Sequence, residues 1–112
     1  MEMVQFSIER RSDAAVLRVR GSLDAYDAAE LEAWLDRLLQ ETARRLVVDL
    51  SAVAFVDTTS AGALTRLGGI SGGPQVVELV VQSAQVARML DALGLTDLLP
   101  TTVVLPSESI PA

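Results

Sequence analysis

The sequence predicts a single α/β domain with a mixed, mostly parallel sheet of four to five strands and about three helices packed against it. Short apolar runs alternate with longer amphipathic stretches along most of the 112 residues, which is typical of parallel strands joined by right-handed helical crossovers. Two neighbouring strand-like segments open the chain, and this arrangement favours an antiparallel pair at one edge of the sheet. Half of the residues are hydrophobic, which is enough for a core without disulfides or metals.

The first two strands are predicted close to the N-terminus. Apolar and polar residues alternate over residues 4–8, as expected of a strand with one buried face. Residues 14–19 form the second predicted strand, and residues 10–13 between them read as a hairpin turn. The segment 21–24 contains Gly and Asp and is expected to end the second strand.

The first helix is predicted over residues 27–42. Asp27 is expected to cap its N-terminus, and Glu30 three residues later completes an arrangement close to a capping box. Apolar side chains recur at the spacing of one helical face. We interpret this stripe as a core face, and its members are Leu31, Trp34, Leu35, Leu38 and Leu39.

The middle of the chain is predicted to contain the central strand and the second helix. Residues 46–50 are almost continuously apolar, which indicates a strand covered on both faces. Residues 51–56 continue as a loop or a bent strand and lead into residues 57–60. The second helix is expected over residues 59–70, and the Gly-Gly-Pro sequence at 72–74 is expected to stop the chain from continuing as a helix.

The last part of the chain adds one more helix between two strands. Residues 76–81 form a predicted strand, Ser83 can cap the following helix, and Gly94 occupies its C-terminal cap position. A final strand is expected at 102–105. The apolar stripe of this helix consists of Val86, Met89, Leu90 and Leu93. The domain is expected to span residues 1–105, and residues 106–112 are expected to form a flexible C-terminal tail.

The composition excludes several classes of function. The chain has no Cys, no His and no Lys, which removes thiol nucleophiles, imidazole bases and the usual zinc sites. The net charge of -6 disfavours binding to nucleic acid. No apolar run approaches the roughly 20 residues of a membrane-spanning helix, and no signal peptide is evident. We therefore expect a cytoplasmic protein without a metal or cofactor.

Asp24 and Asp57 are the first candidate site residues. Each follows a strand-like segment and precedes a helix, and such positions gather on one side of an open α/β sheet. Paired carboxylates could in principle perform acid-base catalysis, but no other residue completes such a site, so we expect that the chain is not an enzyme. Asp24 could equally be a turn residue that binds nearby backbone amides. The glycine-rich stretch at 68–73 follows a helix and indicates helix termination.

Three consecutive hydroxyl residues, Thr58, Thr59 and Ser60, follow Asp57 at the predicted start of the second helix. Capping of the helix explains one of them, because Ser and Thr accept hydrogen bonds from the first backbone amides. A helix N-terminus also stabilises an added phosphate group. From the spacing alone, helix capping is the first interpretation of this segment, and regulation by phosphorylation is the second.

Residues 46–64, with the sequence LVVDLSAVAFVDTTSAGAL, resemble the central signature of STAS domains, as in anti-sigma factor antagonists. That signature contains Asp-Leu-Ser after two apolar residues and, further on, an apolar residue, Asp-Ser-Ser/Thr-Gly, two residues and Leu. Residues 21–24 and 28–31 resemble the family's Gly-x-Leu-Asp segment and first helix, and residues 86–95 resemble its last helix. The resemblance runs in matching order to about residue 99.

The resemblance implies a function and a set of site residues. In such antagonists the unphosphorylated protein binds an anti-sigma factor, which is also a serine/threonine kinase, and the binding releases a sigma factor. The kinase phosphorylates the second hydroxyl after the signature Asp, and a phosphatase reverses this. By position, Asp57 is the signature Asp, Thr59 is the phosphoacceptor and Asp24 faces the partner. The implied partner-binding surface consists of Asp24, Asp57, Thr58, Thr59, Ser60 and Gly62.

The chain departs from the family pattern at this segment. Ser60 stands where the family usually has Gly, which places a side chain at a point that a kinase approaches closely. Ala61 replaces a larger apolar residue, and Thr58 and Thr59 replace the commoner Ser pair. Thr58 and Ser60 are therefore alternative phosphoacceptors.

A second function class stays open on the same resemblance. STAS domains also serve as cytoplasmic subunits of membrane transporters such as phospholipid-transport ATPases, where a similar surface acts without phosphorylation. A third class, a module that senses a small molecule, has no support because no cofactor motif is visible.

Overall fold

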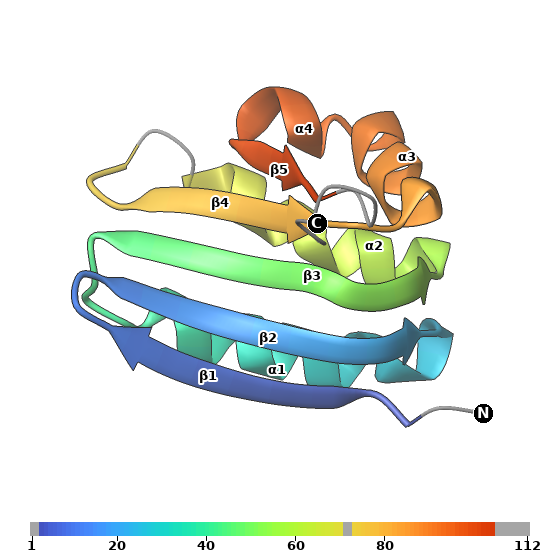
Figure 1. Cartoon of the computed structure of the whole chain (residues 1–112), viewed down its shortest axis with the longest axis horizontal. Coiled ribbons are helices and arrows are strands. Elements are labelled where there is room, and N and C mark those ends of the chain that lie inside the picture. The colour runs from blue at the N-terminus through green and yellow to red at the C-terminus, as the bar shows by residue number, and fades with distance from the viewer. Residues whose placement is uncertain (1–2, 71–72, 105–112) are drawn as a thin grey trace, which may run out of the picture.

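The five strands form one sheet in the order of the sequence (Figure 1). The structure is a computed structural model that describes residues 3–70 and 73–104. Only the first two strands pair antiparallel, and all other neighbours are parallel. The strands are β1 (Gln5–Arg11), β2 (Ala14–Leu23), β3 (Arg45–Val56), β4 (Val76–Val81) and β5 (Thr101–Val103).

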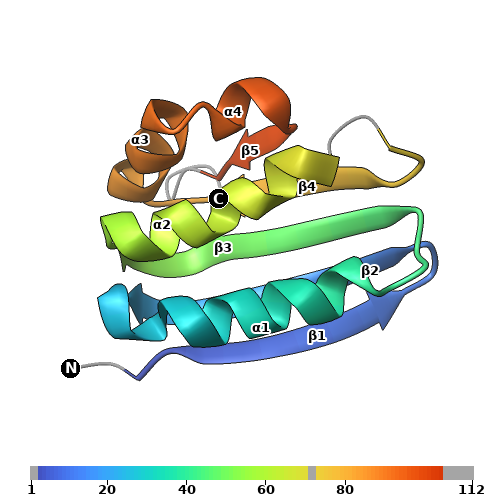
Figure 2. The ribbon, with the colours of Figure 1, turned by 180° about the vertical axis from the view of Figure 1, so that it is seen from behind.

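The helices connect the parallel strands. α1 and α2 lie side by side on one face of the sheet, and α3 and α4 lie beside α2 toward β4 and β5 (Figure 2). The predicted fold class is confirmed. The helical elements are the 3-10 turn η1 (Ala25–Asp27), α1 (Ala28–Leu39), α2 (Thr58–Leu64), its 3-10 continuation η2 (Thr65–Ile70), α3 (Ala84–Ala92) and α4 (Leu95–Leu98). Within the described ranges, none of these helices has the length and apolar character needed to cross a bilayer.

The predicted stripe of α1 forms part of the core. Leu31, Leu35 and Leu38 are fully buried, and Trp34 and Leu39 are partly buried against the same cluster. Trp34 stacks on Phe6 of β1 with the ring centroids 5.8 Å apart, and the guanidinium of Arg37 lies 4.6 Å from the Trp34 ring centroid. The aliphatic layer between α1 and the sheet therefore closes at the β1 edge with an aromatic pair.

Residues 46–50 are not covered by helices on both faces, although Val47 on the face without helices is also buried. The helices cover the face that carries Leu46, Val48 and Leu50, and Figure 1 shows the opposite face without a helix of the described residues over β1–β3. On this open face Asp49 lies 3.7 Å from the guanidinium of Arg18. Long charged side chains cover such a surface with their stems, and a nearly apolar strand therefore does not require a second layer of helices.

β2 also differs from the prediction, because Gly21 bends the strand without ending it. Gly21 has a φ of 104°, and the pairing of β2 with β3 shifts between Gly21 and Ser22. A Cβ atom at Gly21 would lie 3.1 Å from the carbonyl oxygen of Met3, so the backbone of the N-terminal segment also leaves little space for a side chain there. β2 continues to Leu23, which brings the following residue to the end of the sheet.

The remaining element boundaries shift by a few residues. α1 ends at Leu39, residues 51–56 belong to β3, and β5 covers Thr101–Val103. Ser83 caps α3 by accepting from the Val86 N–H, and Gly94 has the left-handed conformation predicted for the end of this helix. The predicted tail at 106–112 lies outside the described residues.

Candidate functional site

Asp24 and Asp57 follow directly after two neighbouring parallel strands. Leu23 at the end of β2 is the register partner of Val56 at the end of β3, and the Asp57 N–H donates to the Leu23 carbonyl oxygen at 2.8 Å. The two aspartates therefore lie at the same end of the sheet, as the sequence predicted. Both side chains are partly buried.

Asp24 is held in a capping box. Its Oδ1 accepts the Tyr26 N–H at 2.9 Å, and its own N–H donates to Asp27 Oδ2 at 2.9 Å. Asp24 is thus the turn residue that one interpretation proposed. Asp27 occupies the N-cap position of α1, as predicted, but its side chain makes no capping bond to that helix. The one-turn helix η1 precedes α1, and the carboxylate of Asp27 binds back to Asp24. The box therefore stands one turn earlier than its sequence pattern indicated.

Asp57 caps α2. Its Oδ2 accepts the Thr59 N–H at 2.9 Å, and its carbonyl oxygen accepts the Ala61 N–H at 2.8 Å. The expectation that a hydroxyl group caps this helix is therefore wrong. The carboxylate of Asp57, which precedes the three hydroxyl residues, occupies the N-cap position. Thr58 and Thr59 are both exposed. Their hydroxyl groups remain available at the surface next to a negatively charged cap.

Ser60 lies differently from the sequence prediction, which placed its side chain at the surface. It is fully buried, and its Oγ donates to the Asp24 carbonyl oxygen at 2.6 Å. The first turn of α2 points this side chain back toward η1 instead of toward an approaching protein. Ser60 therefore links the turn that contains Asp24 to α2, the helix that Asp57 caps.

Gly62 completes the predicted set on the same helix. It is partly buried, and a Cβ atom at this position would meet no described atom beyond the adjoining helix backbone within 4 Å. The fold itself therefore does not demand glycine here. The predicted role of Gly62 in partner binding stays a prediction.

Gln85 supports the site, and its role was not predicted from the sequence. β3 and β4 pair only as far as Leu50 and Val81, so the end of β3 lacks a strand neighbour on this side. The Gln85 side chain replaces it, because its Oε1 accepts the Val56 N–H and its Nε2 donates to the Val56 carbonyl oxygen, both at 3.1 Å. This amide holds the residue that precedes Asp57. One Gln on a helix carries no sequence signal of such a role.

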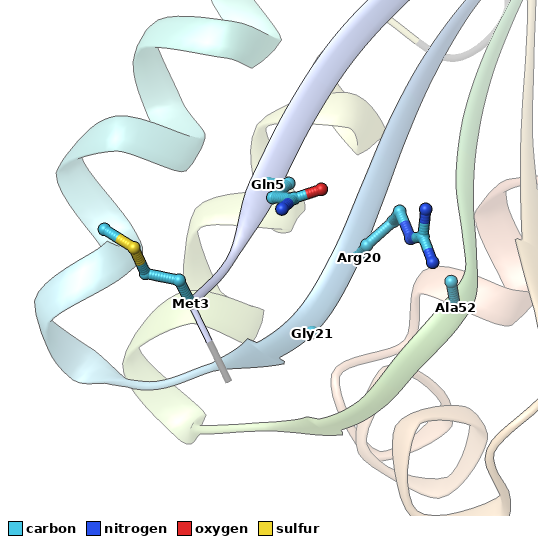
Figure 3. A pocket seen from close by; sticks show the side chains of 5 residues that line it. All are labelled: Met3, Gln5, Arg20, Gly21 and Ala52. Carbon is cyan, nitrogen blue, oxygen red and sulfur yellow. The ribbon is translucent and has the colours of Figure 1, made fainter. Parts of the chain in front are cut away.

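A hollow on the open face of the sheet lies apart from this site. Met3, Gln5, Arg20, Gly21 and Ala52 line it, and none of them is a predicted site residue (Figure 3). Gln5, Arg20 and Ala52 are register partners across three strands. Among the residues that the structure describes, no group of three or more His, Cys, Asp or Glu side chains could hold a metal ion.

The Ser60 hydrogen bond leads to a prediction about stability. Ser60→Ala removes the Oγ donor and keeps the Cβ atom, while the Asp24 carbonyl oxygen still accepts the Asp27 N–H at 3.1 Å. We therefore expect a loss of about 1 kcal/mol in the free energy of unfolding, the value of one ordinary hydrogen bond. Urea unfolding measures this loss. The control is Thr65→Ala, which removes a hydroxyl bond to the Gly62 carbonyl oxygen within the same helical segment. An unchanged stability of Ser60→Ala would contradict the link between Ser60 and the Asp24 carbonyl oxygen.

Comparisons with known proteins agree with the observed fold. A family model described as STAS domain matches residues 5–107. The anti-sigma-B factor antagonist of Staphylococcus epidermidis is 30% identical over 84 residues, which cover 74% of this chain and 78% of the relative. The protein of the same name from Staphylococcus aureus is 29% identical with the same coverage. The crystal structure of an anti-sigma factor antagonist from Mycobacterium paratuberculosis has the same fold, with a TM-score of 0.82, 22% identity, and coverage of 91% of this chain and 87% of that chain.

Proposed function

The chain belongs to the STAS domain family, and on this basis we propose that it is an anti-sigma factor antagonist. It binds an anti-sigma factor, which is also a serine/threonine kinase, and thereby releases a sigma factor in the bacterial cytoplasm. Phosphorylation of Thr59 ends the binding, and a phosphatase restores it. The names of the two staphylococcal relatives support the general role.

One observation carries the proposal for this particular chain. The carboxylate of Asp57 makes the cap of α2 and leaves the adjacent Thr59 exposed, while Ser60 ties the Asp24 turn to the same helix. A modifiable hydroxyl and two carboxylates thus share one fixed surface. Thr58 is exposed as well and remains the alternative acceptor, whereas the buried Ser60 hydroxyl is out of reach in this conformation.

We infer that the protein acts by binding and not by catalysis. Each aspartate of the site has one carboxylate oxygen bound to a backbone N–H, as a structural cap does. The remaining oxygens provide negative charge at the end of the sheet. Such a surface suits a partner that presents basic side chains, because complementary charges favour association and orient the two proteins.

Asp24→Asn tests the role of this charge. Asn keeps the side-chain oxygen that accepts the Tyr26 N–H, so the turn and the melting temperature should remain nearly unchanged. Loss of the negative charge should weaken binding to the anti-sigma factor by roughly tenfold or more. Isothermal titration calorimetry measures the change in Kd.

The matched control for this experiment is Asp97→Asn, which removes the same charge from the exposed face of α4. Its Kd should equal that of the parent. Equal binding by the Asp24→Asn variant would refute a role of Asp24 in partner recognition.

A further inference from the structure

Tyr26 is an aromatic side chain in the middle of the η1 turn. Its exposed fraction is 94%, compared with 86% for Met3 and 54% or less for the other exposed large hydrophobic residues of the described chain. The ring therefore contributes almost nothing to the core. Exposure of a single hydrophobic residue is ordinary, and its surroundings decide whether it has a function.

The backbone that carries Tyr26 is fixed by four hydrogen bonds. The Tyr26 N–H donates to Asp24 Oδ1, the Asp24 N–H donates to Asp27 Oδ2, and the Asp27 N–H donates to the Asp24 carbonyl oxygen. The fourth bond comes from Ser60 Oγ of α2, which donates to the same carbonyl oxygen at 2.6 Å. The ring is thus displayed from a rigid turn, so little backbone entropy is lost when a partner covers it.

The neighbouring charges define the kind of partner. Asp24 and Asp27 flank Tyr26 in the chain, and Asp57 follows the adjacent strand at the same end of the sheet, on the right in Figure 1. Phe55, which is 46% exposed, is the register partner of Ser22 at this end. An exposed aromatic ring on a turn that also carries two carboxylates is complementary to an apolar pocket with a basic rim. The same negative charge disfavours an anionic membrane surface.

We propose that Tyr26 is the anchor residue of the protein-binding surface. Its ring enters an apolar pocket on the partner, and basic side chains around that pocket pair with Asp24 and Asp57. Tyr is suited to this role because it buries a large area at the cost of few side-chain rotations, and such residues dominate the binding energy of many interfaces. This inference rests on the proposed function, because the partner is the anti-sigma factor.

Three variants test the anchor by calorimetric titration with an anti-sigma factor from the same organism. Tyr26→Ala should raise Kd by roughly 30-fold or more, as truncation of an anchor residue does. Tyr26→Phe keeps the ring and should stay within about fivefold of the parent. Val76→Ala, at the opposite end of the sheet and 49% exposed, should leave Kd unchanged. Thermal unfolding should show equal stability for Tyr26→Ala and the parent, because the backbone bonds of the turn remain.

The Kd values of the parent and the variants show whether the Tyr26 anchor or the antagonist function itself fails. If the parent and Tyr26→Ala bind with Kd values within twofold of each other, the anchor is overturned while the antagonist function stands. If Tyr26→Ala and Val76→Ala weaken binding equally, the effect is not specific to the turn and the anchor is also overturned. If the parent binds no anti-sigma factor, the proposed function and the anchor fail together.

Discussion

Thr59→Glu is expected to abolish binding to the anti-sigma factor while the domain stays folded. The new carboxylate would lie beside Asp57, whose Oδ2 already accepts the Thr59 N–H. A phosphate group at this position adds about -1.5 to -2 charge at neutral pH and is larger still. In a packed interface an unpaired charge costs several kcal/mol, which corresponds to a loss on the order of 100-fold or more in affinity.

The fold should tolerate the same change because two opposed effects act on α2. The helix N-terminus favours negative charge by about 0.3–1 kcal/mol, and repulsion from the capping carboxylate of Asp57 offsets part of this gain. Thr59 is exposed, so no core packing is lost. Circular dichroism and thermal unfolding should therefore show a variant close to the parent.

Two further variants make this experiment specific. Thr65→Glu adds the same charge to the exposed residue that directly follows α2 and should bind like the parent. Thr59→Ala should bind permanently and lose little stability, because Asp57 and not Thr59 caps the helix. If Thr59→Glu binds as tightly as Thr65→Glu, the switch at this position does not exist and the transporter-subunit alternative gains support.

Leu35→Ala should have the largest effect on stability among these variants. Leu35 is fully buried on the face of α1 that packs against the sheet. Removal of its branched side chain leaves a cavity and costs roughly 2–5 kcal/mol of the free energy of unfolding. A loss of that size is a large part of the total stability of a small domain.

Urea unfolding followed by circular dichroism measures this loss. Leu93→Ala is the control, since Leu93 is 37% exposed at the end of α3 and should cost under about 1 kcal/mol. A loss for Leu35→Ala below about 0.5 kcal/mol would contradict the core position of this residue.

The sequence predicted the parts of the fold that depend on local pattern and chain order. The spacing of Leu31, Leu35 and Leu38 identified the buried face of α1, and Ser83 and Gly94 marked the two ends of α3. The alternation of strands and helices determined which strand ends meet, and this placed Asp24 beside Asp57. Short-range periodicity and the handedness of crossovers suffice for such predictions.

The parts that the sequence did not predict depend on hydrogen bonds between distant residues. The direction of Ser60 is determined by a carbonyl group 36 positions earlier in the chain. The role of Gln85 arises because β4 ends at Val81 while β3 continues to Val56. The Gln85 amide then binds a residue 29 positions earlier in the chain. Asp27 fitted a local capping pattern for α1, but its side chain instead completes the capping box of the preceding turn η1. Local patterns do not contain such long-range partners, and competing caps of similar strength are decided by the surrounding fold.

An anti-sigma factor antagonist should release a sigma factor from its complex with the anti-sigma factor, and this release can be measured. The purified sigma factor carries a fluorescent label, and fluorescence anisotropy follows its release as this chain is added with or without prior phosphorylation by the anti-sigma kinase and ATP. Mass spectrometry identifies the modified residue. We predict that the unphosphorylated chain releases the sigma factor, and that the chain phosphorylated on Thr59 does not. Retention of the sigma factor in the complex at saturating unphosphorylated chain would contradict the assignment as an anti-sigma factor antagonist.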